Sequence, residues 1–273
     1  MTTHQTRRTA EQTAALISRL PALMPPPIPR LPEGIAVGDT PPLPTTTPSG
    51  AVVGGSLVSF TAELDAAHAT DLSYALGFCQ LQVTQNQGVD PTADPIGYYH
   101  AVTTMLTNIG FVTQGVNFST FNTETKTVEL DQVVVQVLQG LLTGDELLTA
   151  VATLNALKED ADDNGAPWAI WSSHSQSSGN GTFSVGAASQ TKGPDGAPHV
   201  AMDISGFKMT GTETSDRFLW ATYNTTSLNI DYGKTTMTFN DDLWSSPGVG
   251  DAISAAMKKH SAGYIAGLPP LKL

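Results

Sequence analysis

Four residues near the middle of the chain have the types and spacing of a calcium-binding loop. Asp160, Asp162 and Asn164 carry side-chain oxygens at alternate positions, and Gly165 follows them. A calcium loop uses such residues at positions 1, 3 and 5, a glycine at position 6 and a bidentate glutamate at position 12. Trp171 stands at position 12 and cannot bind a cation. We therefore interpret the segment as a helix C-terminus followed by an Asn-Gly turn. A weak calcium site at Asp160, Asp162 and Asn164 is the alternative.

A second candidate for chemistry is His174, which lies between Ser173 and Ser175. Catalytic Ser-His pairs are assembled across a fold, so adjacency in sequence says little about them. The chain also lacks the G-x-S-x-G elbow of the α/β-hydrolases. The adjacent residues Asp241 and Asp242 favour a cap or a turn over an acid-base pair. A hydrolase with a dispersed site is accordingly the least favoured function.

The charge of the chain limits its partners. Charged residues make up only 14% of the 273 residues, and the formal net charge is −12. No Lys or Arg occurs between Arg30 and Lys126. Because binding to nucleic acid depends on cations that neutralise phosphates, we expect no nucleic-acid partner. The acidic balance also disfavours anionic lipid, although peripheral membrane contact is not excluded.

The abundance of Ser and Thr predicts a hydroxyl-rich surface with few ions. Such a surface is easily buried against another protein, because few charges must lose their water. An extracellular protein with no partner would have the same composition. The sequence therefore favours a protein partner or self-association without requiring either.

Cys79 is the only cysteine, so an intramolecular disulfide and a cysteine-based zinc site are excluded. It shares a helical face with Leu72, Leu76 and Val83, which predicts a buried, unreactive thiol; a reactive or lipidated thiol is the alternative. We expect no cofactor. No apolar run is long enough for a transmembrane helix, and no signal peptide is recognised, so export would need a dedicated route.

Three parts are predicted along the chain. Residues 1–50 form a proline-rich N-terminal arm, which either docks on a partner or is a disordered tail, with a short helix at about 9–20. Residues 51–165 form a mainly helical region. Residues 166–273 form an antiparallel β-sheet with a closing helix and a C-terminal peptide.

The pattern of apolar residues predicts the elements inside these parts. Helices are expected where apolar residues recur at steps of three and four, at about 62–86, 95–110, 130–142 and from 143 onward, and again at about 249–260. Asp94 is the expected N-cap of the second, and Thr143 with Glu146 a capping box for the fourth. A short strand or hairpin is expected within 116–130.

Strands are expected where apolar and polar residues alternate, at 167–175, 181–189, 199–211, 217–231 and 234–240. A turn at Asp231–Gly233 would join the last two. In a strand, Trp168 and Trp171 would lie on opposite faces, so one would be covered by the helical layer or exposed. The fold class is therefore α+β: a mainly helical N-terminal layer packed on a four- to five-stranded antiparallel sheet, with a short C-terminal helix.

The functional prediction is a non-enzymatic interaction protein, either a self-assembling subunit or a cargo or effector held through its terminal peptides. The first alternative is a membrane-active toxin or lipid-binding virulence factor. It is motivated by Thr-rich strands such as 217–240, whose alternation suits a surface between lipid and water. The hydrolase with a dispersed site is the second alternative.

Overall fold

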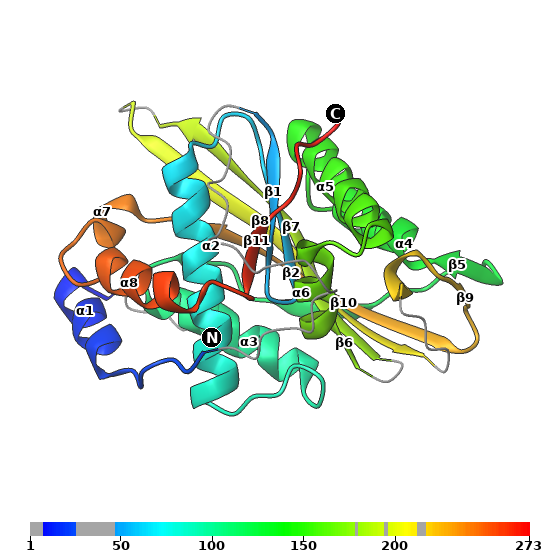
Figure 1. Cartoon of the computed structure of the whole chain (residues 1–273), viewed down its shortest axis with the longest axis horizontal. Helices are drawn as coiled ribbons and strands as arrows, with labels where there is room; N and C mark the ends of the chain where they lie inside the picture. Colours follow the sequence, from blue (N-terminus) through cyan, green and yellow to red (C-terminus); the bar gives the residue numbers. More distant parts are fainter. Residues whose placement is uncertain (1–7, 26–46, 178–179, 194–195, 212–216) are drawn as a thin grey trace, which may run out of the picture.

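The chain folds around one large β-sheet that carries helices on both of its faces (Figure 1). The computed structural model describes residues 8–25, 47–177, 180–193, 196–211 and 217–273. Mixed helices and strands confirm the α+β class. Residues 26–46 of the predicted proline-rich arm lie outside the described residues, and the division of the chain into three parts stays a prediction.

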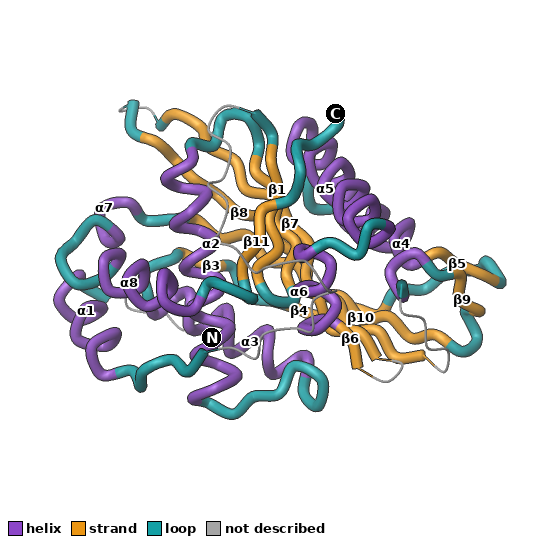
Figure 2. The backbone as a smooth tube through the Cα atoms, viewed as in Figure 1, coloured by secondary structure: helices purple, strands orange, loops and turns teal. Residues whose placement is uncertain are grey.

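The described strands fall into a large sheet and a small one, shown in orange in Figure 2. Those of the large sheet are β1 (Ser49–Val53), β2 (Ser56–Phe60), β3 (Val112–Thr113), β4 (Asn117–Thr120), β6 (Gln176–Ser177), β7 (Asn180–Lys192), β8 (Pro198–Gly211), β10 (Leu228–Thr238) and β11 (Ile265–Gly267). The small sheet contains only β5 (Thr127–Glu129) and β9 (Thr222–Asn224).

The described α-helices are α1 (Ala10–Arg19), α2 (Ala66–Leu81), α3 (Pro95–Asn108), α4 (Leu130–Gln139), α5 (Gly144–Asp162), α6 (Ala166–Ser175), α7 (Asp241–Trp244) and α8 (Gly250–His260). A π-helical turn, η1 (Gln82–Asn86), extends α2, and a 3₁₀ turn, η2 (Phe218–Trp220), precedes β9. Asp94 caps α3 by accepting a hydrogen bond from the Gly97 N–H, as the sequence predicts. Thr143 precedes α5 but makes no side-chain cap, so the predicted capping box is wrong.

The large sheet has nine strands among the described residues, in the order β11-β1-β2-β7-β8-β10-β3, with β4 beside β10 and β6 beside β7. This corrects the predicted four or five strands. The pairing of β2 with β7 is parallel, and the other pairings are antiparallel. The sheet is therefore mixed. Gly54-Gly55, between two apolar runs, is the hairpin signal that the analysis of the sequence missed for β1 and β2.

Two separate cores lie on the two faces of the sheet. Along β8, Val200, Met202 and Ile204 contact the core under α2, α3 and α8. Further along the same strand, Phe207 and Met209 contact the core under α4, α5 and α6. The change from even to odd positions moves the apolar side chains to the opposite face. The predicted single helical layer is thus corrected to helices on both faces (Figure 1).

The segment 166–175 is the helix α6, although the sequence predicted a strand. Residues 168–171 are apolar at all four positions, so they fit a strand and a helix equally well. Pro167 in the first turn, and the carboxylate of Asp160, which accepts the Trp168 N–H at 2.7 Å, decide for the helix.

The predicted turn at Asp231–Gly233 is also wrong, because β10 runs through it and pairs with β8 along its whole length. Gly233 serves close packing here. A Cβ on it would lie 2.6 Å from a methyl group of Val116 and 2.8 Å from the ring of Phe118. The glycine therefore lets the Val116 and Phe118 side chains pack closely on β10, with no change of chain direction.

Candidate functional site

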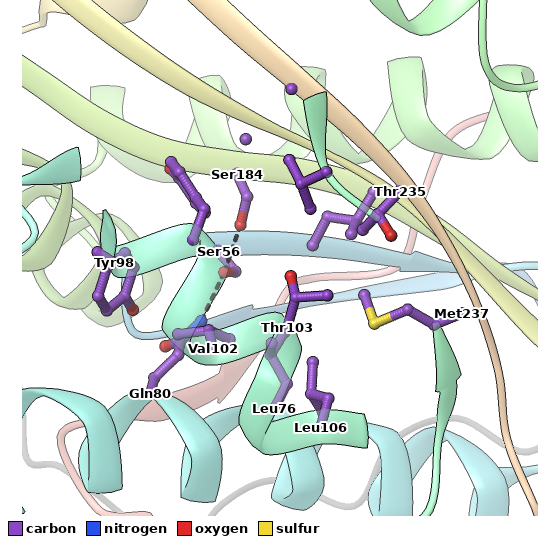
Figure 3. Close-up of a pocket in the computed structure, with 15 residues that line it drawn as sticks. Ser56, Leu76, Gln80, Tyr98, Val102, Thr103, Leu106, Ser184, Thr235 and Met237 are labelled. Atoms are coloured by element: carbon purple, nitrogen blue, oxygen red, sulfur yellow. Dashed lines mark hydrogen bonds between the residues drawn. The ribbon is translucent and has the colours of Figure 1, made fainter. Parts of the chain in front are cut away.

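A small cavity lies between the helix pair α2–α3 and the sheet (Figure 3). Its volume is about 30 Å³, enough for little more than one water-sized molecule. Apolar side chains from α2, α3 and β10 form most of its wall, among them Leu76, Val102, Leu106 and Met237. The cavity as it stands is too small for an organic substrate, so any such ligand would require α2 or α3 to move.

One end of the cavity is polar and holds a chain of hydrogen bonds. Gln80 Nε2 donates to Ser56 Oγ at 2.7 Å, and Ser56 Oγ lies 2.5 Å from Ser184 Oγ (Figure 3). On the other side, the Tyr264 hydroxyl donates to Gln80 Oε1 at 2.8 Å. Since Ser56 accepts from Gln80, its own proton is free to bond Ser184. All four side chains are buried. Their hydrogen bonds connect α2 to β2, to β7 and to the residue before β11.

This hydrogen-bonded chain contains no group that takes up a proton near neutral pH. Burial raises the pKa of Tyr264 far above its ordinary value. The nearest imidazole is His174, whose ring meets the Tyr264 ring edge-on with centroids 4.9 Å apart. The arrangement therefore satisfies buried polar atoms and fixes the relation of α2 to the sheet. It does not provide an activated nucleophile.

His174 itself gives little support to the hydrolase interpretation. Its Nδ1 lies 2.8 Å from the Ile170 carbonyl oxygen and 2.9 Å from Ser173 Oγ. A ring nitrogen that faces a carbonyl carries the proton and donates it, so Nδ1 cannot accept a proton from Ser173. Burial lowers the pKa of His174, which keeps the imidazole neutral. The geometry thus leaves Ser173 without a general base.

A second imidazole, His68, holds two helix ends together. Its Nδ1 lies 2.8 Å from Asp65 Oδ2 and its Nε2 lies 2.7 Å from Asp241 Oδ1. Asp65 is the N-cap of α2, and Asp241 is the first residue of α7. We call Asp65, His68 and Asp241 the His68 clasp. The sequence analysis missed it, since its members lie far apart in the chain.

The clasp is an electrostatic cluster. Burial of the ring opposes protonation, but the hydrogen bonds that the ring donates to Asp241 and Asp65 outweigh burial and raise the pKa of His68. Burial also works against ionisation of Asp65, yet its hydrogen bonds with the His68 backbone and ring lower its pKa. A third carboxylate, Asp71, lies close by, and burial raises its pKa although Trp244 donates a hydrogen bond to it. The His68 ring thus lies between two carboxylates, and the third interacts with it electrostatically without a hydrogen bond.

The predicted calcium ligands lie around the end of α5. Asp160 accepts the Trp168 N–H, and burial raises its pKa. Asp162 pairs with Arg217 instead of turning toward Asp160. Asn164 has a left-handed backbone with φ of 52°, as an Asn-Gly turn requires. Among the described residues, no group of three or more His, Cys, Asp or Glu could hold a metal ion. The calcium interpretation stays a prediction.

The aromatic residues that could have formed an exposed site are buried. Trp168 and Trp171 lie on the same side of α6, with ring centroids 5.5 Å apart, and are 8% and 0% exposed. Trp171 also stacks on Phe218, at 5.3 Å between centroids. The expectation of opposite faces is corrected, because residues three apart in a helix share a face. Cys79 is fully buried, which raises the pKa of its thiol, as the sequence predicts.

One stretch of the chain contributes no ionic side chain to the surface, although Arg8 from outside it donates a hydrogen bond to the Asn108 side chain. Residues 95–123, which include α3, β3 and β4, contain no Asp, Glu, Lys or Arg. Side chains exposed there include those of His100, Thr104 and Asn117, and Val112 is 52% exposed. We call the exposed part of residues 95–123 the uncharged face. In the described residues, no helix is long and apolar enough to cross a membrane.

Comparison with known proteins gives distant structural similarities only. No protein-family model matches the chain, and no curated protein matches it. Its structure is similar to that of the Evf virulence factor, with a TM-score of 0.40 and 14% identity over 77% of this chain and 82% of that one. It is similar to a delta-endotoxin, with a TM-score of 0.37 and 13% identity over 82% of this chain and 98% of that one.

A third similarity is to the activated Cyt2Ba monomer from Bacillus thuringiensis subsp. israelensis, with a TM-score of 0.34 and 11% identity. It covers 67% of this chain and 96% of that one. All three TM-scores are below 0.5. The similarities therefore establish neither a family nor a function, and the functional argument below uses the geometry of this chain alone.

Proposed function

We propose that this protein is a non-enzymatic interaction protein that docks on another protein through its uncharged face. The observation that carries the proposal is the absence of ionic residues from 95–123 in a chain of net charge −12. Docking removes water from the surfaces that meet, and the cost is large for charged groups and small for hydroxyl and amide groups. Away from Arg8, which donates a hydrogen bond to Asn108, a partner can therefore bind the uncharged face without desolvating ions.

The polar groups of the interior support the same proposal, because they stabilise the fold and are not available for catalysis. The side chains of Ser184, Ser56, Gln80 and Tyr264 are hydrogen-bonded to one another in series. His174 donates to a backbone carbonyl, and His68 is held between two carboxylates. A catalytic site needs a nucleophile within reach of a base that can accept its proton. Neither imidazole is placed for that role.

The proposal is tested by placing a charge on the uncharged face. Purified full-length protein, Thr104→Lys and the control Ala255→Lys are immobilised and exposed to extract of the producing cells. Thr104 is exposed on α3 and Ala255 is exposed on α8, so both substitutions add one cation without altering a core. Quantitative mass spectrometry should find proteins retained by the unsubstituted chain and the control but lost with Thr104→Lys. Equal retention by all three would contradict the proposal.

Two further arms separate the alternatives. Replacing residues 26–46 by a Gly-Ser linker of equal length tests docking through the N-terminal arm, which would be lost in that variant alone. A hydrolase screen with His174→Gln tests the enzymatic alternative. Turnover that disappears in His174→Gln would replace the interaction proposal by an enzymatic one.

A membrane-active function is the second candidate, and one observation favours it. The helix pair α2–α3 covers one face of the sheet, and no ionic residue occurs in 72–89 or 95–123. α2 is buried along most of its length between the sheet and α8. His68 and Asp71 lie in the first turns of α2, and from Leu72 onward the helix has no ionic side chain; a helical segment of that kind is stable in a protein interior or in contact with lipid. If α2 and α3 moved away from the sheet, the apolar side chains of the helices and of the sheet face beneath them would both become exposed.

Dye release from neutral and anionic vesicles tests this second candidate. The measurement is made at pH 6 and pH 8.5, because loss of the proton from His68 weakens the contact between α2 and α7. Leakage that increases at the higher pH, together with co-sedimentation of the protein, would support membrane activity. Intact vesicles at both pH values would remove it.

A further inference from the structure

The edge strand β4 presents unpaired backbone groups at the uncharged face. β4 pairs with β10 on one side, and no described strand pairs with its other side. The Phe121 N–H donates to the Ile230 carbonyl at 2.8 Å, so the backbone of Phe121 points toward β10. Backbone direction alternates along a strand, which turns Ser119 toward β10 and turns Phe118 and Thr120 outward. β4 therefore offers the N–H and C=O of Phe118 and the N–H of Thr120 to a further strand.

Proteins protect such edges with charged side chains, prolines, bulges or short strands. The β3–β4 edge uses two of these devices. Residues 114–116 stand opposite only two residues of β10, which makes a bulge between β3 and β4. β4 is also short, at four residues. It has neither a charge nor a proline, and Asn117, Ser119 and Thr120 are exposed. β4 itself therefore has no ionic side chain to keep another strand away.

The charged residues beside this edge lie on the neighbouring strand β10 and not on β4 itself. On β10, Asp231 pairs with Lys208 at 3.6 Å, and Lys234 lies over the ring of Tyr232 at 5.7 Å from its centroid. Two copies of a chain with net charge −12 repel each other over most of their surfaces. β4 itself contributes no charge to that repulsion.

We infer that two copies of this chain associate by antiparallel pairing of their β4 strands across a twofold axis. The large sheet then continues from one copy into the other, next to β10 (Figure 2). Antiparallel pairing of a strand with its own copy satisfies a twofold axis, because each residue meets the same surface on the partner. This inference rests on the proposed function and names its partner as a second copy. Four residues per strand bury little area, so the dimer is weak and forms with increasing concentration.

The test is sedimentation equilibrium over a wide range of protein concentration, with three variants. Ser119→Lys places two cations close together across the twofold axis. Thr120→Pro removes an outward N–H without breaking the ladder to β10. Ala255→Lys, on α8, is the control for the added charge. We expect the unsubstituted chain and the control to move from monomer to dimer together, and the two β4 variants to associate at least tenfold more weakly.

Hydrogen exchange locates the contact independently of the variants. The Phe118 and Thr120 amides should exchange more slowly at high protein concentration than at low concentration, and the Ser119 amide should not change. A monomer at every concentration, or association of Ser119→Lys equal to that of the control, would overturn the inference. If the chain is monomeric but Thr104→Lys still abolishes retention of another protein, the self-pairing is wrong and the proposed docking function stands.

Discussion

Replacing His68 by glutamine should lower the stability of the protein in a way that depends on pH. In the folded chain the imidazole bridges Asp65 at 2.8 Å and Asp241 at 2.7 Å and is itself 13% exposed. Glutamine has a similar reach and can bond one carboxylate, but it carries no charge. The variant therefore leaves Asp65, Asp71 and Asp241 close together without a cation.

The size of the effect follows from the exposure of the partners. A hydrogen bond to a charged group contributes about 1.5–3 kcal/mol when it is well buried. The side chains of Asp65 and Asp241 are 48% and 34% exposed, so solvent screens both interactions. We expect a loss of roughly 1–2 kcal/mol in the free energy of unfolding. For a chain of this size that corresponds to a fall in Tm of roughly 2–8 °C.

The pH dependence has a definite sign. The folded-state pKa of His68 is raised above its ordinary value of 6.5, so the clasp contributes fully below about pH 6.5 and its contribution is lost as pH rises through the folded pKa. The pKa of Asp65 is lowered below 3.8, so its contribution is present above that value and is lost as pH falls through the folded pKa. The unsubstituted chain should exceed His68→Gln most between about pH 4 and pH 6.5.

Urea unfolding, followed by tryptophan fluorescence from pH 4 to pH 9, measures this difference. His199→Gln is the control, because His199 is exposed at the start of β8. It should follow the unsubstituted chain at every pH. A stability difference for His68→Gln that is the same at pH 5 and pH 9 would refute the charged clasp. The protection of the amides near Asp241, relative to their intrinsic exchange rate at each pH, should also fall on raising the pH of the unsubstituted chain.

Three further predictions concern packing, the buried polar chain and the clasp. Gly206→Ala should lower the free energy of unfolding by about 1–3 kcal/mol, because its Cβ would lie 2.9 Å from the Tyr99 ring; Gly115→Ala, which meets nothing within 4 Å, should be near neutral. Gln80→Leu should cost roughly 1–3 kcal/mol in urea unfolding, since it leaves buried hydroxyls without a partner; an unchanged midpoint would show that the polar chain is dispensable. Asp71→Asn should stabilise the fold by under about 1 kcal/mol at pH 7, because burial disfavours its charge; a destabilised variant would contradict this sign.

The cap and periodicity signals identified most helices correctly because both are local. Asp94 and Pro95 start α3 where the sequence places the start, although the capping box predicted at Thr143 is absent from α5. These interactions span a few residues, so the residues themselves determine them. The burial of Cys79 follows in the same way from helical spacing.

Where local signals were balanced, tertiary contacts decided the structure. Residues 168–171 are apolar throughout, and a hydrogen bond from Trp168 to the distant Asp160 makes them helical. Gly233 resembles a turn residue in sequence, yet packing against Phe118 keeps it inside β10. In both cases the deciding partner is invisible to a short window of sequence.

The candidate sites show the same division. Composition alone determined that the chain is acidic, that it has few charged residues and that it lacks clusters of cations for nucleic acid. These properties follow from counting charged residues in the sequence and do not depend on where folding places them. Only the tertiary structure brought His68 to Asp241 and placed the neutral residues 95–123 at an open sheet edge. Side chains that are far apart in the chain interact only after folding fixes their separation, and no spacing in the sequence encodes that distance.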